Sequence, residues 1–140
     1  MTNIRVLAEY GDLCGEGPLW DFRTGQLYWT DMLGKRIYCY DWGTQSHRIA
    51  KEGFEVCGFT FDAAGCFVVA NSTGFWSSVG EGSPHLITRE AGGHTCQLND
   101  CIADPAGRVL AGSQFYDPAR DYPLGCLISL DGNGKARILR

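Results

Sequence analysis

Three side chains that could bind a ligand or take part in a reaction occupy matching places in the sequence. Glu16, Cys57 and Asn99 each lie five residues before an Asp that opens a turn. Carboxylate and amide oxygens, as in Glu16 and Asn99, are the ligands that a hard cation such as Ca²⁺ or Mg²⁺ prefers. Glu16 is also flanked by glycines at the head of an apolar run. A solvated loop Glu is the alternative, but the symmetry with Asn99 favours a functional role.

An internal repeat relates these positions. A short apolar run, an Asp, a Gly three or four residues later and a second apolar run recur at residues 19–31, 60–71 and 102–113. Asp21, Asp62 and Asp104 are 41 and 42 residues apart. The Asp can bond the backbone two residues on, and the Gly closes the turn with positive φ. Further apolar runs follow, so each period predicts four strands.

A period near 40 residues with four strands per unit is typical of β-propeller blades. The sequence predicts an all-β fold, an incomplete β-propeller of about three four-stranded blades. It forms a single partial domain over residues 1–140, with repeats at about 12–52, 53–94 and 95–140. Chance alignment of β-hairpins in a sandwich is the alternative. A fourth Asp would fall near position 145. Because propellers have about four to eight blades, the chain either is a fragment or closes by self-association through open blade edges.

The composition narrows the function classes. The formal net charge is −4, from 12 Lys and Arg against 16 Asp and Glu, and the basic residues are scattered. No nucleic-acid or anionic-membrane partner is expected, since each needs a clustered basic face. No apolar run is long enough for a transmembrane helix. The seven Cys show no C-x-x-C spacing, and no signal peptide is apparent. We therefore expect a cytoplasmic protein with reduced, mostly buried thiols.

Several segments, in order and at matching spacing, resemble the gluconolactonase/regucalcin family, also called senescence marker proteins. The resemblance covers about residues 8 to 140. The segments are GEGPLWD at 15–21, LYWTD at 27–31, ND at 99–100, DPAGR at 104–108, AGS at 111–113 and YPLGCLISLD at 122–131.

This resemblance implies a six-bladed propeller that hydrolyses sugar lactones with one divalent metal ion, Ca, Zn, Mn or Mg, in its channel. Glu16 matches the first metal ligand, and Asn99 matches a polar residue that contacts the substrate. Two further ligands, an Asn and an Asp, come from later blades. That Asp is the expected general base, so no catalytic residue is assigned within residues 1–140.

Two positions depart from the family pattern. Gln97 stands at a substrate-binding position where the family often has Arg. A neutral amide therefore replaces a charged guanidinium that could make two parallel hydrogen bonds. Cys101 stands where the family usually has Gly, and its side chain would either crowd the channel or pack between blades. The predicted function is a metal-dependent hydrolase of sugar lactones, weakly active or inactive as this chain alone. The alternative is a non-catalytic propeller fragment or interaction scaffold.

Overall fold

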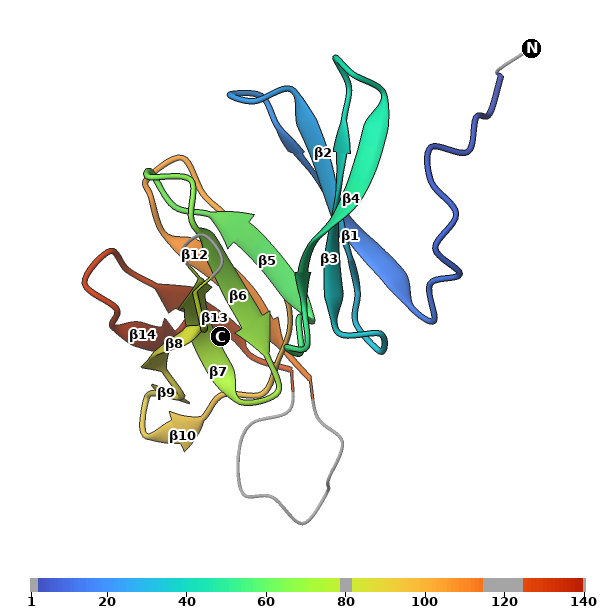
Figure 1. Ribbon diagram of the computed structural model, residues 1–140. Helices are drawn as coiled ribbons and strands as arrows, with labels where there is room; N and C mark the ends of the chain where they lie inside the picture. Colours follow the sequence, from blue (N-terminus) through green and yellow to red (C-terminus); the bar gives the residue numbers. More distant parts are fainter. Residues whose placement is uncertain (1–2, 79–81, 115–124, 140) are drawn as a thin grey trace. The chain divides into compact units, whose positions relative to one another are not determined.

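The computed structural model describes residues 3–78, 82–114 and 125–139. These residues form β-strands joined by turns (Figure 1). The chain divides into two compact units, Met1–Val56 and Cys57–Arg140. Within the described ranges, no helix has the length and apolar character needed to cross a membrane. Residues 122–124, which belong to the last family-like segment, lie outside the described residues.

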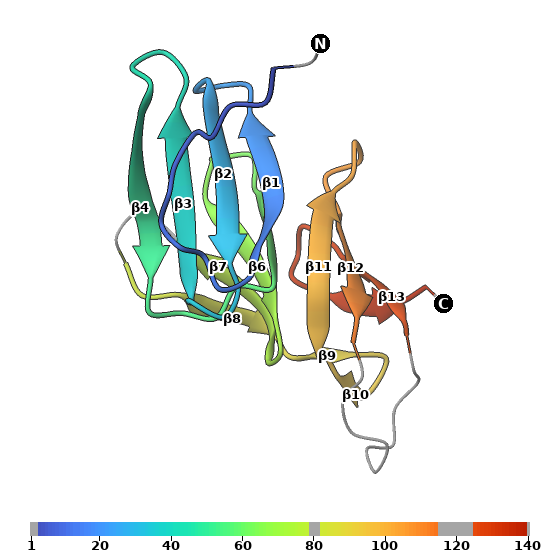
Figure 2. The same cartoon turned by 90° about the vertical axis from the view of Figure 1, so that its right-hand side faces the viewer.

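The first unit contains one four-stranded antiparallel sheet in which each strand pairs with the next one along the chain. Figure 2 shows its strands side by side in this order. This up-and-down arrangement is that of a propeller blade. The strands are β1 (Gly15–Asp21), β2 (Gln26–Asp31), β3 (Arg36–Asp41) and β4 (Ser46–Glu52).

The segment before β1 covers one face of this sheet. The ring of Tyr10 stacks on Tyr38 with 4.3 Å between centroids, and its hydroxyl lies 2.8 Å from Nδ1 of His47. Arg5 donates from Nη2 to the hydroxyl of Tyr40 at 3.4 Å. Tyr38 and Tyr40 are consequently buried, with 0% and 2% exposed.

The second unit contains two further four-stranded antiparallel sheets, each in chain order. A short hairpin of β9 (Glu90–Ala91) and β10 (His94–Thr95) lies between them in sequence. The first sheet has β5 (Gly58–Phe61), β6 (Phe67–Asn71), β7 (Gly74–Ser78) and β8 (His85–Thr88). The second has β11 (Leu98–Ala103), β12 (Val109–Ser113), β13 (Leu127–Leu130) and β14 (Ala136–Ile138).

The two sheets of this unit share one apolar core, and their first strands β5 and β11 contact each other. The approach is close at Gly58, where a Cβ would stand 2.7 Å from the Cα of Asp100 and 2.7 Å from the amide nitrogen of Cys101. Only Gly fits this position without a shift of backbone. Adjacent first strands are what neighbouring propeller blades require.

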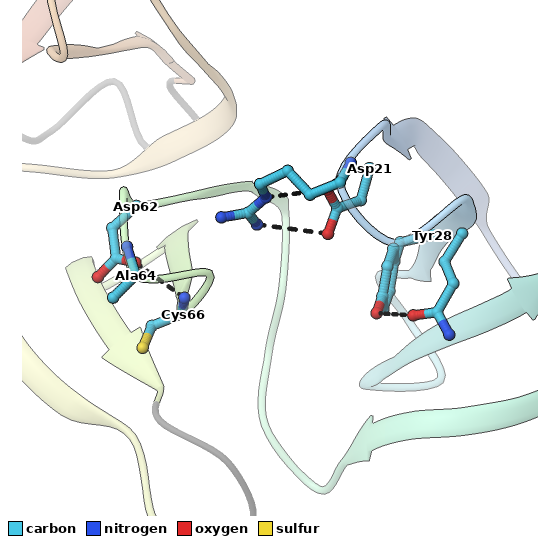
Figure 3. A network of polar contacts seen from close by, with 7 residues as sticks. Asp21, Tyr28, Asp62, Ala64 and Cys66 are labelled. Carbon is cyan, nitrogen blue, oxygen red and sulfur yellow. Dashed lines mark hydrogen bonds and ion pairs between the residues drawn. The ribbon is translucent and has the colours of Figure 1, made fainter.

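Asp side chains build the turns as the sequence predicts. Oδ1 of Asp62 accepts the N–H groups of Ala64 and Cys66 at 2.9 and 2.8 Å (Figure 3). Asp104 bonds the N–H groups two and four residues on in the same way. Asp21 likewise accepts the N–H two residues on, that of Arg23, and it also accepts the guanidinium of Arg23. All three turns join the first strand of a sheet to the second.

Candidate metal and substrate site

Glu16 lies on β1 at a β-bulge. Glu16 pairs with Thr30, and the register then shifts because Gly17 and Pro18 together stand opposite Trp29. Gly17 has a φ of 60°, a left-handed conformation that glycine adopts at little cost. Bulges re-aim side chains and occur frequently beside active sites. The Gly-Glu-Gly-Pro sequence therefore places a half-buried carboxylate on an irregular strand end.

The segment that leads into Glu16 is fixed by the buried carboxylate of Asp31, at the end of β2. Oδ1 of Asp31 accepts the N–H groups of Cys14 at 2.9 Å and Gly34 at 3.0 Å. Oδ2 accepts the N–H of Leu13 at 3.0 Å. Burial alone would raise the pKa of Asp31, but these three backbone donors hold that pKa below its ordinary value.

Asn99, in the second unit, also lies at a β-bulge. Leu98 pairs with Ser113 and Asp100 pairs with Gly112, so Asn99 is an extra residue in β11 with no partner in the ladder of β12. Asn99 is exposed. The bulges in β1 and β11 occur at the same end of the first strand of a sheet.

Gln97 comes directly before β11 and is half-buried. Its carbonyl accepts the N–H of Gln114 at 2.9 Å, and the side chain of Gln114 donates from Nε2 to the carbonyl of Leu98 at 3.4 Å. The backbone before Asn99 is thus held from the following strand, as the backbone before Glu16 is held by Asp31.

The middle member of the series, Cys57, has a different setting. It is 2% exposed and donates its N–H to the carbonyl of Ala70 at 3.1 Å just before β5 begins. The ladder between β5 and β6 runs without a register shift. The two positions that carry oxygen donors therefore have bulges, whereas the position that carries a thiol does not.

Cys101, which replaces the usual Gly of the family pattern, packs between the two sheets of the second unit. It belongs to their shared core with 9% exposed. Burial, together with the nearby charge of Asp100, raises the pKa of its thiol to about 12. Of the two outcomes expected from the sequence, the structure shows packing between blades.

The predicted site residues fall in both units. Gln97 and Asn99 belong to the second unit, at the start of β11, and Glu16 belongs to the first. A common site for all three stays a prediction. Across the part of the chain that the structure describes, no group of three or more His, Cys, Asp or Glu side chains is arranged to hold a metal ion.

Asp31 was not predicted as part of the site. Its signal in the sequence is weak, because an Asp at the end of an apolar run also suits an ordinary turn. Its partners Leu13 and Cys14 lie 18 and 17 residues earlier. No local sequence pattern indicates a contact between residues this far apart along the chain.

Comparison with known proteins decides the family. The sequence model of one protein family, described as the SMP-30/gluconolactonase/LRE-like region, matches residues 14–140 of this chain. The chain belongs to this family. Pentonolactonase XacC of Haloferax volcanii, one similar protein, is 34% identical over 120 residues, which are 86% of this chain and 40% of that protein. The 6-deoxy-6-sulfogluconolactonase of Pseudomonas putida is 28% identical over 138 residues, 97% of this chain and 47% of that protein. The chain thus spans less than half the length of these relatives.

Solved structures agree on the fold. A gluconolactonase from Xanthomonas campestris matches with a TM-score of 0.76 and 18% identity, over 92% of this chain and 48% of that one. The calcium-binding protein regucalcin from Agrobacterium tumefaciens matches with a TM-score of 0.68 and 19% identity, over 96% of this chain and 45% of that one. The predicted incomplete β-propeller of the SMP-30/gluconolactonase family is therefore confirmed.

Proposed function

We propose that this chain is the part of a metal-dependent sugar-lactone hydrolase that carries its first metal ligand, Glu16, and the substrate-binding residues Gln97 and Asn99. Family membership over residues 14–140 supports the reaction class. The observation that carries the residue assignment is the pair of bulges at Glu16 and Asn99, at the same end of the first strands of two sheets.

The donors present suit one divalent cation, Ca, Zn, Mn or Mg. Glu16 offers a half-buried carboxylate at the start of a strand; carboxylate oxygens are preferred ligands of Ca²⁺ and Mg²⁺ and also bind Zn²⁺. A bound cation would polarise the lactone carbonyl and favour the negative charge that develops on its oxygen. Glu16 holds the cation in place, and Asn99 orients the substrate through its amide.

Gln97 points to a neutral lactone. A neutral amide replaces the Arg that the family often carries, and an amide cannot form the charged, two-pronged contact that Arg makes with a carboxylate, sulfonate or phosphate. We therefore assign the chain to lactones of neutral sugars. The general base lies outside residues 1–140 in this proposal, so the chain alone is weakly active or inactive.

The thiols support a reducing compartment. None of the cysteines forms a disulfide, and five are buried, namely Cys39, Cys57, Cys96, Cys101 and Cys126. Disulfides are rare in the cytosol, and buried cysteines outside disulfides behave as small hydrophobic residues. We accordingly place the protein in the cytoplasm.

The test is a chimera in which this chain replaces the matching 40% of Haloferax volcanii pentonolactonase. Hydrolysis of pentono- and gluconolactones is followed with a pH indicator in the presence of Ca²⁺, Mn²⁺, Mg²⁺ or Zn²⁺. We expect metal-dependent turnover that Glu16→Gln abolishes. Turnover that survives Glu16→Gln would remove Glu16 from the metal site. A chimera that melts cooperatively but hydrolyses no lactone would favour a non-catalytic propeller.

A further inference from the structure

Asp31 is a buried charge whose hydrogen bonds tie the backbone before β1 to the turn after β2. Only 2% of the residue is exposed. Its carboxylate nevertheless accepts three N–H groups, two of them from Leu13 and Cys14 directly before β1 and one from Gly34 after β2. Burying a carboxylate is costly unless such bonds replace its water. The surroundings of Asp31 are therefore built for a charged side chain.

We propose that Asp31 is the positioning residue for Glu16. This inference rests on the proposed function, in which Glu16 holds the divalent cation. Asp31 fixes Leu13 and Cys14 through its side chain, and the N–H of Met32 donates to the carbonyl of Cys14 at 3.1 Å. The residue just before Glu16 then pairs with Asp31 itself in the ladder. The backbone that leads into the bulge at Glu16 is thus held both by the side chain of Asp31 and by backbone pairing with the end of β2.

The strand opposite Glu16 is fixed as well. Thr30, the ladder partner of Glu16, is 0% exposed. Its hydroxyl lies 2.9 Å from the carbonyl of Arg36 and 3.1 Å from the carbonyl of Val56, so its single proton is shared between these two acceptors. Thr30 therefore cannot rotate freely. With Thr30 immobile, the position of Glu16 depends on the segment that Asp31 holds.

The position accepts only the shape of Asp. A Cβ added at Gly34 would overlap the carboxylate of Asp31, so the turn after β2 closes tightly over it. A longer Glu has no room there. Asn has the right shape, but its NH₂ group would face a backbone N–H where Asp offers an oxygen. Asp31→Asn therefore keeps the packing and removes at least one of the three bonds.

Amide hydrogen exchange by NMR on the complete 140-residue chain tests the inference. In Asp31→Asn, we expect the amides of Leu13, Cys14 and Glu16 to exchange at least about tenfold faster, because bonds to a charged acceptor are lost. Asp41→Asn is the matched control. Asp41 ends β3 at the opposite end of the same sheet, where it accepts the N–H of Thr44 and the side-chain amide of Gln26.

An unchanged exchange rate at Glu16 in Asp31→Asn, or an equal increase in Asp41→Asn, would overturn the positioning role. Mn²⁺ titration of the same samples provides a second readout. Paramagnetic broadening around Glu16 should need about 10- to 100-fold more Mn²⁺ in Asp31→Asn, as when groups that orient a metal ligand are removed, and no more in Asp41→Asn. If Glu16→Gln leaves the broadening of the unsubstituted chain unchanged, the proposed metal ligand fails, while the exchange rates still decide the role of Asp31.

Discussion

Gly58 of β5 and Asp100 of β11 approach each other so closely that a Cβ at position 58 would stand 2.7 Å from the Cα of Asp100. The contact joins the first strands of two successive sheets, one position from the bulged Asn99. The neighbour is backbone, which cannot swing away as a flexible side chain can. The spacing of β5 and β11, and with it the position of Asn99, therefore depends on glycine at position 58.

Gly58→Ala should destabilise the chain by about 1–3 kcal/mol, the usual cost of forcing a methyl group into a packed interior. Gly112→Ala is the control. Gly112 also lies in a strand, but a Cβ there meets nothing within 4 Å, so this change should be neutral or slightly stabilising. Urea unfolding followed by circular dichroism gives both values. Equal midpoints for the two variants would show that β5 and β11 are not packed this closely.

The turn after β2 allows a second comparison of glycines. Gly34→Ala should lower stability and weaken the bonds of Asp31, since the new methyl group would overlap its carboxylate. Gly43→Ala, in the turn after β3, places a methyl group 3.4 Å from Oδ1 of Asp41, which is ordinary contact. We expect a lower urea midpoint for Gly34→Ala alone. Equal effects would indicate that the turn after β2 relaxes without loss.

Stability should depend on pH through Asp31. Its pKa is lowered in the folded chain, so the unfolded chain binds this proton more readily. The stabilisation is complete above the ordinary Asp pKa of about 3.9 and is lost as the pH falls through the lower folded value. The difference in urea midpoint between the unsubstituted chain and Asp31→Asn should therefore be largest near neutral pH and should shrink in acid. A difference that stays constant down to about pH 3 would contradict this.

The thiols should react in two classes. Burial raises the pKa of Cys96 to about 11 and that of Cys101 to about 12, so at pH 8 only about one Cys101 in 10⁴ is a thiolate. Cys14 and Cys66 are half-buried. Iodoacetamide should therefore label Cys14 and Cys66 in the folded chain, and all seven cysteines only in urea. Mass spectrometry of peptides gives the sites, and rapid labelling of Cys101 would show that the core opens.

Local sequence was sufficient for the turns and the sheet order. Asp62 and Asp104 each accept backbone N–H groups within four residues, so their role can be predicted from a short stretch of sequence. The roles of Asp31 and Gly58 depend on partners far along the chain, and no spacing rule identifies them. The bulges were equally hidden, because a register shift depends on how two strands pair. Glu16 and Asn99 were predicted as site residues because the repeat put them in equivalent positions and because the segments around them resemble the family.

The isolated chain should hydrolyse sugar lactones negligibly. The general base is expected outside residues 1–140, and such a group contributes about 10²–10⁴-fold. The described residues offer no cluster of three acidic, His or Cys ligands, whereas Ca²⁺ takes about six to eight oxygens. Pairing of two copies through open blade edges would not remedy this, because it repeats Glu16, Cys57 and Asn99 and adds no Asp at that position.

Glucono-δ-lactone hydrolysis is measured with a pH indicator on size-fractionated protein, with added Ca²⁺, Mn²⁺ or Zn²⁺. Metal-dependent turnover that elutes with the monomer and is lost in Glu16→Gln would show that these residues suffice. Turnover confined to a dimer fraction would show instead that a second copy supplies the missing groups.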